Sequence, residues 1–246
     1  MMRRLLSESW GVLLLFAVWQ IYVMAMHFNS IVIVTPLAVL EDIATHPLVY
    51  ALPTLWTLGF ALAGLAGGLA IGLLLAVLAW RSKSFSGMIT PSALLLSSTP
   101  VVCLIPLMAR IFGYRSSTEL AIVAVLTFFP AFVFASSGLE ALPPMSSELF
   151  AIFAASPWKR LWLLALPAAA PNLAAALRVG AAYSVLVTVV AEYLMQTGGL
   201  GTMFALMSQE FQTERAFGAS VAAMALSSAL YSLASAAEAR IRARSQ

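Results

Sequence analysis

Long apolar runs alternate with short polar segments along the whole of this chain, and the runs predict its architecture. About six of them approach or exceed ~20 residues, the length that an α-helix needs to cross the hydrocarbon core of a bilayer. No segment shows the strict apolar-polar alternation that is typical of a β-strand. We therefore predict an all-α integral membrane fold with spans at residues 10–28, 51–80, 89–111, 120–142, 171–195 and 217–237.

The composition supports this prediction. The chain is 62% hydrophobic and only 9% charged, whereas soluble domains are about half apolar and about a quarter charged. A water-soluble fold of 246 residues could not bury so much apolar surface. We predict a single transmembrane domain over residues 1–246. Within it, residues 1–50 form an uncleaved first span and an outer loop, and residues 51–246 form the core.

The basic residues predict the orientation, because cytoplasmic segments of membrane proteins are enriched in Lys and Arg. With the amino terminus inside, about nine basic residues fall on the inner side and about three on the outer side. Both termini and residues 140–170 are then cytoplasmic, and residues 29–49 and 197–216 face outwards. The inner residues are Arg3, Arg4, Arg81, Lys83, Lys159, Arg160, Arg240, Arg242 and Arg244.

Two charged residues inside the fifth run need an explanation, because a charge in the bilayer is costly unless it is paired or hydrated. Glu192 either lines or gates a path through the membrane, or makes a helix-to-helix hydrogen bond with a residue such as Ser228 or Tyr193 of another protomer. Arg178 has a long stem that can extend to the cytoplasmic interface.

Small residues and prolines suggest where helices pack and where one breaks. Gly64, Gly68 and Gly72 recur at a spacing of four, which predicts close helix packing, with solute contact as the alternative. The segment 198–201 is glycine-rich and predicts a turn. In the third run, Pro100 and Pro106 remove helical hydrogen bonds, so they and Thr99 are candidates for a path wall. The hydroxyls of residues 97–99 are alternative partners for the freed carbonyls.

Several kinds of chemistry lack the necessary residues. Cys103 is the only cysteine, which excludes an intramolecular disulfide, and the two histidines, His27 and His46, belong to no Cys/His cluster. No catalytic set of nucleophile and base is visible, and no basic stripe suggests nucleic acid. We expect no metal and no bound cofactor.

The inner segment 148–167 is the most distinctive part of the sequence. It carries an acidic residue, small residues, Pro157 as a helix-start signal, aromatic residues and a basic pair. On composition alone it is typical of an amphipathic helix that lies at the membrane surface without a partner. The residues to which we assign a role are Glu148, Ala154, Ala155, Ser156, Pro157, Lys159, Arg160, Leu166 and Pro167.

The same segment resembles the EAA loop of ABC-importer permeases, E-A-A-x3-G-x9-I-x-L-P. The corresponding positions are Glu148, Leu149, Phe150, Ala154, Leu164, Leu166 and Pro167. Ala154 stands where the family has Gly, and Leu149 and Phe150 stand where it has two Ala. Other short motifs follow in the order found in the nitrate/sulfonate/taurine group. They are Ser98-Thr99-Pro100, Leu104-Ile105-Pro106-Leu107, Phe128-Phe129-Pro130, Leu177-Arg178, Ala191-Glu192 and Gly198-Gly199-Leu200-Gly201.

The resemblance implies a type I importer (MetI-like) permease fold and a non-catalytic transport subunit in a bacterial inner membrane. The implied partners are two ABC ATPase subunits that bind ATP and Mg, a second copy of the permease, membrane lipid, and a periplasmic or lipid-anchored solute-binding protein. The implied solute is a small anion such as a sulfonate, nitrate or taurine, or an aromatic heterocycle such as a pyrimidine vitamin precursor. The main alternative is a secondary transporter, and a membrane enzyme is a further one.

Overall fold

The structure is a computed structural model that describes residues 2–26, 29, 33–142, 145, 150, 152 and 156–245, without the side chains of residues 2–9, 12, 13, 97, 244 and 245. The described part is helical and contains no strand. Its elements are α1 (Met2–Ala25), α2 (Pro36–Thr45), α3 (Pro47–Arg81), α4 (Lys83–Ser98), α5 (Val101–Phe112), α6 (Ser116–Glu140), α8 (Pro157–Arg160), a π-helix (Leu161–Ala165), α9 (Leu166–Met195), α10 (Gly199–Gln209) and α11 (Thr213–Ser245).

Four helical stretches of the described residues are long and apolar enough to cross a membrane: Pro47–Arg81, Ser116–Glu140, Pro157–Met195 and Thr213–Ala243. The pair α4 and α5 makes a fifth candidate if it is counted as one broken span. The described apolar part of α1, Leu14–Ala25, is shorter. The multi-pass helical architecture agrees with the sequence prediction, and the total of about six spans stays a prediction.

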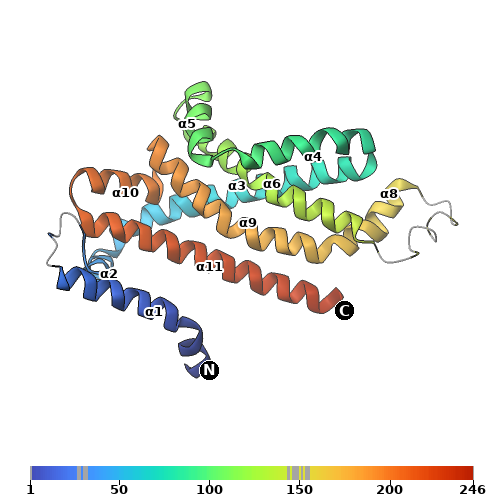
Figure 1. The fold of residues 1–246 in the computed structure, drawn as a ribbon. Coiled ribbons are helices and arrows are strands. Elements are labelled where there is room, and N and C mark those ends of the chain that lie inside the picture. The colour runs from blue at the N-terminus through green and yellow to red at the C-terminus, as the bar shows by residue number, and fades with distance from the viewer. Residues whose placement is uncertain are drawn as a thin grey trace.

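Helices α3, α6 and α9 form the centre of the bundle, and α11 lies along α9 (Figure 1). The spaced glycines lie where α3 meets α6. A Cβ added at Gly72 would come within 2.6 Å of the Ala131 Cβ and 2.8 Å of the Phe128 carbonyl oxygen. A Cβ at Gly68 would lie 2.9 Å from the Ala124 carbonyl oxygen. Absent side chains therefore allow the two backbones to approach closely.

The third predicted span is broken at Pro100. Helix α4 ends at Ser98, α5 begins at Val101, and the two axes differ by 102°. In Figure 1, α5 projects away from the bundle while α4 lies along it. Pro91 and Pro106 lie inside α4 and α5 without breaking them, so only one of the three prolines in this run ends a helix.

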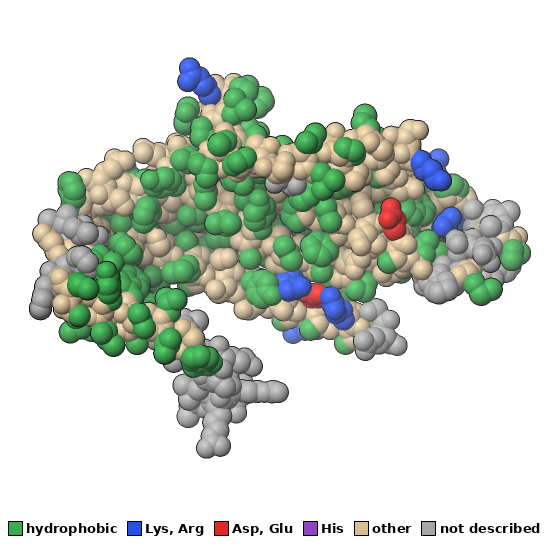
Figure 2. Space-filling model, viewed as in Figure 1, with side chains coloured by type: hydrophobic (Ala, Val, Ile, Leu, Met, Phe, Trp, Pro, Cys, Tyr) green, Lys and Arg blue, Asp and Glu red, His purple; other side chains and the backbone are tan. Residues whose placement is uncertain are grey.

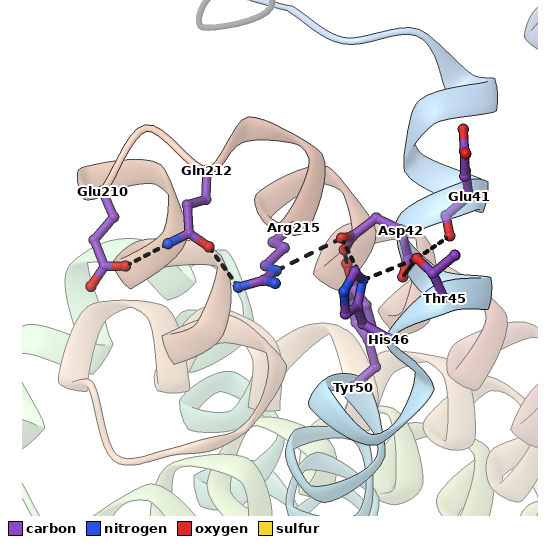
Figure 3. A network of polar contacts seen from close by, with 8 residues as sticks. All are labelled: Glu41, Asp42, Thr45, His46, Tyr50, Glu210, Gln212 and Arg215. Carbon is purple, nitrogen blue, oxygen red and sulfur yellow. Dashed lines mark hydrogen bonds and ion pairs between the residues drawn. The ribbon is translucent and has the colours of Figure 1, made fainter.

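The two segments predicted as outer loops are largely helical, and α2 packs against α11. They form α2 and α10, at the end of the bundle opposite α8 (Figure 1). A polar network joins them, shown in Figure 3. The Asp42 carboxylate accepts a hydrogen bond from the Tyr50 hydroxyl and contacts His46 Nδ1 at 3.1 Å and Arg215 Nε at 3.8 Å. Arg215 in turn donates to the Gln212 side-chain oxygen at 2.8 Å.

Apolar and basic side chains occupy different parts of the surface. On the face shown in Figure 2, hydrophobic side chains cover the length of the bundle, and Lys and Arg gather near α8 and near the end of α11, with another basic side chain at the tip of α5. Apolar side chains along this length, such as Leu52, Leu74 and Leu186, are 72%, 59% and 58% exposed. Such a continuous exposed apolar surface suits lipid and not water.

Candidate functional site

The inner segment is described from Ser156 onwards. The Ser156 side-chain oxygen accepts a hydrogen bond from the Lys159 backbone N–H at 3.4 Å, and Pro157 is the first residue of α8. A Ser cap followed by Pro is a normal helix start, so this part of the segment begins a helix as its sequence predicts. Three residues assigned to this segment lie outside the described residues: Glu148, Ala154 and Ala155.

Two arginine–tryptophan contacts hold this segment against the end of α3. The Arg81 guanidinium lies 6.0 Å from the centre of the Trp158 ring, and that of Arg160 lies 5.7 Å from the Trp80 ring. A cavity of about 290 Å³ is lined by Trp80, Arg81, Pro157 and Arg160. The Arg160 Nε is buried and has no hydrogen-bond partner among the described residues. This surface therefore offers cationic groups and a hollow at one end of the bundle.

A π-helix at Leu161–Ala165 connects α8 to α9. π-Turns are rare and are frequent at functional sites. Leu161 and Ala165 are buried, whereas the Trp162 side chain is 66% exposed. Leu166 and Pro167 lie in the first turn of α9, so the chain from Pro157 to Met195 is one continuous helical stretch.

The bend between α4 and α5 is stabilised by local hydroxyls. Ser98 Oγ and Thr99 Oγ1 both donate to the Leu95 carbonyl oxygen, at 2.8 and 3.2 Å. Hydroxyls therefore satisfy a carbonyl at the end of α4, which is the alternative role considered for them above. Pro100 and Pro106 are exposed. Their role in a path, and that of Thr99, stays a prediction.

A cavity of about 320 Å³ lies beside this bend. Its walls come from the bend itself, from α6 and from α9. Thr99 is the only residue of the predicted path that lines it. The lining residues are Leu96, Thr99, Val101, Val125, Leu126, Phe129, Pro130, Val179 and Tyr183.

Glu192 is fully buried and joins three helices at the opposite end from α8. Thr57 Oγ1 lies 2.8 and 2.9 Å from its two carboxylate oxygens, and the Gly201 N–H donates to Oε2 at 2.9 Å. The Leu200 N–H donates to Thr57 Oγ1 at 2.9 Å. We call Thr57, Glu192, Leu200 and Gly201 the outer clamp. It is a helix-to-helix hydrogen bond, as one of the two sequence interpretations proposed, and its partner within this chain is Thr57 and not Ser228.

The glycines before and within α10 make room for the outer clamp. Gly198 and Gly199 have φ values of +122° and +77°, which L side chains rarely adopt. A Cβ at Gly199 would overlap the Glu192 carboxylate. The predicted turn is therefore present at Gly198–Gly199, and α10 starts directly from it.

A second buried glutamate, Glu119, was not predicted from the sequence. It lies in the first turn of α6 and is 0% exposed. The Thr197 hydroxyl is close to it but outside normal hydrogen-bond geometry, and neither carboxylate oxygen has a partner among the described residues. A polar residue at the edge of an apolar run usually lies in water, so nothing local in the sequence indicates that Glu119 is buried.

Arg178 links α9 to α11 instead of only extending towards water. It forms an ion pair with Glu238, and its Nη1 donates to the Tyr231 hydroxyl at 2.7 Å. Arg242 contacts the other oxygen of Glu238 at 2.7 Å. The sequence interpretation placed Arg178 near the inner interface but did not identify these partners.

Comparison with known families gives a match over most of the chain. Residues 68–244 match the family described as "Binding-protein-dependent transport system inner membrane component". A probable ABC transporter permease protein of Haemophilus influenzae is 28% identical over 221 residues, covering 90% of this chain and 89% of the relative.

Other relatives have names that state a solute. The formylaminopyrimidine transport permease ThiX of Halalkalibacterium halodurans is 28% identical over 155 residues, covering 63% of this chain and 62% of that protein. The putative aliphatic sulfonates transport permease SsuC of Bacillus subtilis is 28% identical over 160 residues, covering 65% and 56%. Among solved structures, a chain of the inward-facing MetNI methionine ABC transporter matches with a TM-score of 0.62 at 18% identity, covering 77% of this chain and 93% of the other. That structural match supports the fold alone.

Proposed function

Because the chain belongs to the family of binding-protein-dependent transport system inner membrane components, we propose a specific way in which it transports its solute. The chain is the membrane-spanning, non-catalytic permease subunit of an ABC importer with a MetI-like fold. ATP binding in partner ATPases would press on the α8 end of the bundle. The resulting tilt of the helices would open the solute path alternately to each side of the membrane.

The observation that carries this proposal is the pair of arginine–tryptophan contacts between α8 and α3. Through Trp80–Arg160 and Arg81–Trp158, a force on α8 reaches α3 as well as α9, to which α8 is joined through the π-helix. Cation–π contacts at partly exposed sites contribute about 0.5–1 kcal/mol each. The cavity beside them and the unpaired Arg160 Nε leave room and a hydrogen-bond donor for an acidic or carbonyl group of a partner.

The family implies ATPase and binding-protein partners for the permease. We propose the finer arrangement of two ATPase subunits that hold ATP and Mg, two copies of this permease, and a periplasmic or lipid-anchored solute-binding protein. The proposed location is the lipid bilayer of a bacterial cytoplasmic membrane with both chain termini inside. Helix α8 lies towards the same end of the bundle as the carboxyl-terminal end of α11 (Figure 1). This supports a position of both segments on the same side of the membrane.

For the solute, the relatives provide two classes. ThiX is named for a formylaminopyrimidine and SsuC for aliphatic sulfonates. We propose that this chain moves a small solute of one of these classes, an aromatic heterocycle or a small anion. The family match favours ATP-driven import over the secondary-transporter alternative, because members of the family work with binding proteins.

Affinity purification of the chain from its native membrane, followed by mass spectrometry, tests the assembly. We expect an ABC ATPase in stoichiometric amount and a solute-binding protein. A clean homo-oligomer without an ATPase would overturn the proposal and favour a secondary transporter.

A charge reversal tests the contact surface. Arg160→Glu should abolish co-purification of the ATPase, because it removes one arginine–tryptophan contact and places an acidic group beside the cavity. Lys83→Glu is the matched control, since Lys83 is an exposed basic residue at the same end of the bundle. Full ATPase recovery with a normally inserted Arg160→Glu permease would reject this surface as the ATPase contact.

A further inference from the structure

The cavity beside the α4–α5 bend is lined without a single charged side chain. Its nine lining residues include no Asp, Glu, Lys, Arg or His. Bringing an anion into such a place costs free energy unless donors replace the water that it loses. The uncharged lining therefore favours an aromatic heterocycle over a small anion as the solute of this permease.

The hydrogen-bonding groups of the cavity are mostly acceptors. The Thr99 hydroxyl donates to the Leu95 carbonyl oxygen at 3.2 Å, which leaves its oxygen as an acceptor for a solute. Pro130 has no N–H, which leaves the Leu126 carbonyl without its normal helical donor. The Tyr183 hydroxyl makes no hydrogen bond among the described residues and is the one side-chain donor in the lining. A sulfonate or nitrate needs several hydrogen-bond donors, whereas this cavity offers mainly hydrogen-bond acceptors.

Two aromatic rings face the cavity from different helices, Phe129 from α6 and Tyr183 from α9. Aromatic side chains pair favourably with flat rings in offset or edge-to-face geometry. The volume of about 320 Å³ is near the lower limit of typical ligand pockets, about 300–1,000 Å³. The size therefore favours a small solute.

From this geometry we infer that the cavity is a solute site for a small, uncharged, flat aromatic ring compound that carries N–H donors, and that it disfavours sulfonates and other anions. The inference rests on the proposed function, since it identifies the solute class of that same permease. The rings of Phe129 and Tyr183 hold the solute, its N–H groups donate to Thr99 Oγ1 and the Leu126 carbonyl, and the Tyr183 hydroxyl donates to a ring nitrogen or carbonyl.

Direct binding to the permease–ATPase complex in lipid nanodiscs tests the inference without selection by the binding protein. The probes are radiolabelled cytosine and adenine, which are uncharged ring compounds, and ethanesulfonate. We expect saturable binding of at least one ring compound and none of ethanesulfonate. Tyr183→Phe should weaken ring binding by about three- to tenfold, which corresponds to the loss of one hydrogen bond.

A cavity-filling pair of variants locates the site. Val125→Trp fills the cavity and should abolish ring binding. Val133→Trp is the matched control, because Val133 lies on the same helix, is 43% exposed and is not in the lining. It should leave binding within about twofold, since its side chain does not reach the cavity.

Two binding results would overturn the inference: saturable ethanesulfonate binding that Val125→Trp removes, or no saturable binding of either ring compound. A phospholipid that native mass spectrometry finds in the native complex but not in Val125→Trp would also overturn it. So would a disulfide between two copies that carry Val125→Cys in a Cys103→Ser background. In each case an intact ATPase-bound complex with ATP-driven uptake would leave the proposed function standing. A complex without an ATPase would reject the proposed function itself.

Discussion

At the scale of single residues, two buried glutamates near the same end of the bundle have opposite surroundings. Glu192 accepts hydrogen bonds from a hydroxyl and a backbone N–H, whereas Glu119 has no partner among the described residues. Both side chains are 0% exposed. A buried polar group is costly unless its hydrogen bonds are made, so the two should respond differently to mutation.

Thr57→Val should destabilise the protein by about 1–3 kcal/mol, because it leaves the Glu192 carboxylate and the Leu200 N–H without a partner in the interior. The measurement is the midpoint of unfolding of the purified permease in detergent. Thr54→Val is the control, since the Thr54 hydroxyl bonds only to the Tyr50 carbonyl in its own helix. Equal midpoints for the two variants would contradict a structural role of the outer clamp.

Glu119→Gln should leave the unfolding midpoint unchanged or raise it, because it replaces an unpaired carboxyl by a neutral group of the same shape. Glu192→Gln should lower the midpoint, because its amide has one acceptor oxygen where the carboxylate offers two to Thr57 and Gly201. Parallel thermal unfolding of the two variants measures this contrast. A loss of stability in Glu119→Gln equal to that in Glu192→Gln would show that Glu119 has a partner of its own.

At the scale of elements, the contact between α3 and α6 depends on missing side chains. Gly68→Ala should destabilise this contact by about 1–3 kcal/mol, because the new methyl group would meet Thr127 and the Ala124 carbonyl oxygen. Gly59→Ala lies in the same helix with nothing within 4 Å of the added Cβ. It should be neutral or stabilising by up to about 1 kcal/mol. Unfolding in detergent compares the two, and equal effects would argue against close packing.

The break in the third predicted span could be predicted from the sequence only in part. Its three prolines indicated that the helix could break, but their local chemistry does not say which one ends it. Pro91 and Pro106 are exposed inside helices, whereas Pro100 follows Ser98 and Thr99, whose hydroxyls satisfy a carbonyl at the end of α4. The break therefore depends on a combination of proline and neighbouring hydroxyls, together with contacts to α6 and α9 that are distant in sequence.

At the scale of the whole molecule, the basic residues predict that both termini lie in the cytoplasm. In a Cys103→Ser background, Glu210→Cys in intact cells should react with a membrane-impermeant maleimide. Arg240→Cys should react only after permeabilisation. The reverse pattern would invert the proposed orientation.

The sequence predicted the helical membrane fold and the helix start at Pro157 because both have local signatures: apolar length and a Ser-Pro pair. It did not predict Trp80 beside Arg160, Thr57 beside Glu192, or the burial of Glu119. Those pairings join positions as distant as 135 residues, and only packing of α3 against α6 and α9 brings them together. Small and hydroxyl residues in an apolar run are too common to indicate such partners.

The outer clamp has a mechanical consequence when it is considered together with the arginine–tryptophan contacts. Helices α3 and α9 are joined at one end through Trp80 and Arg160, and at the other through Thr57 and Glu192. Thr57 and Trp80 are about 35 Å apart along α3, at 1.5 Å of rise per residue. Two helices attached to each other at both ends would tilt together, so under the proposed function a push on α8 would also displace α10, which contacts Glu192 through Gly201.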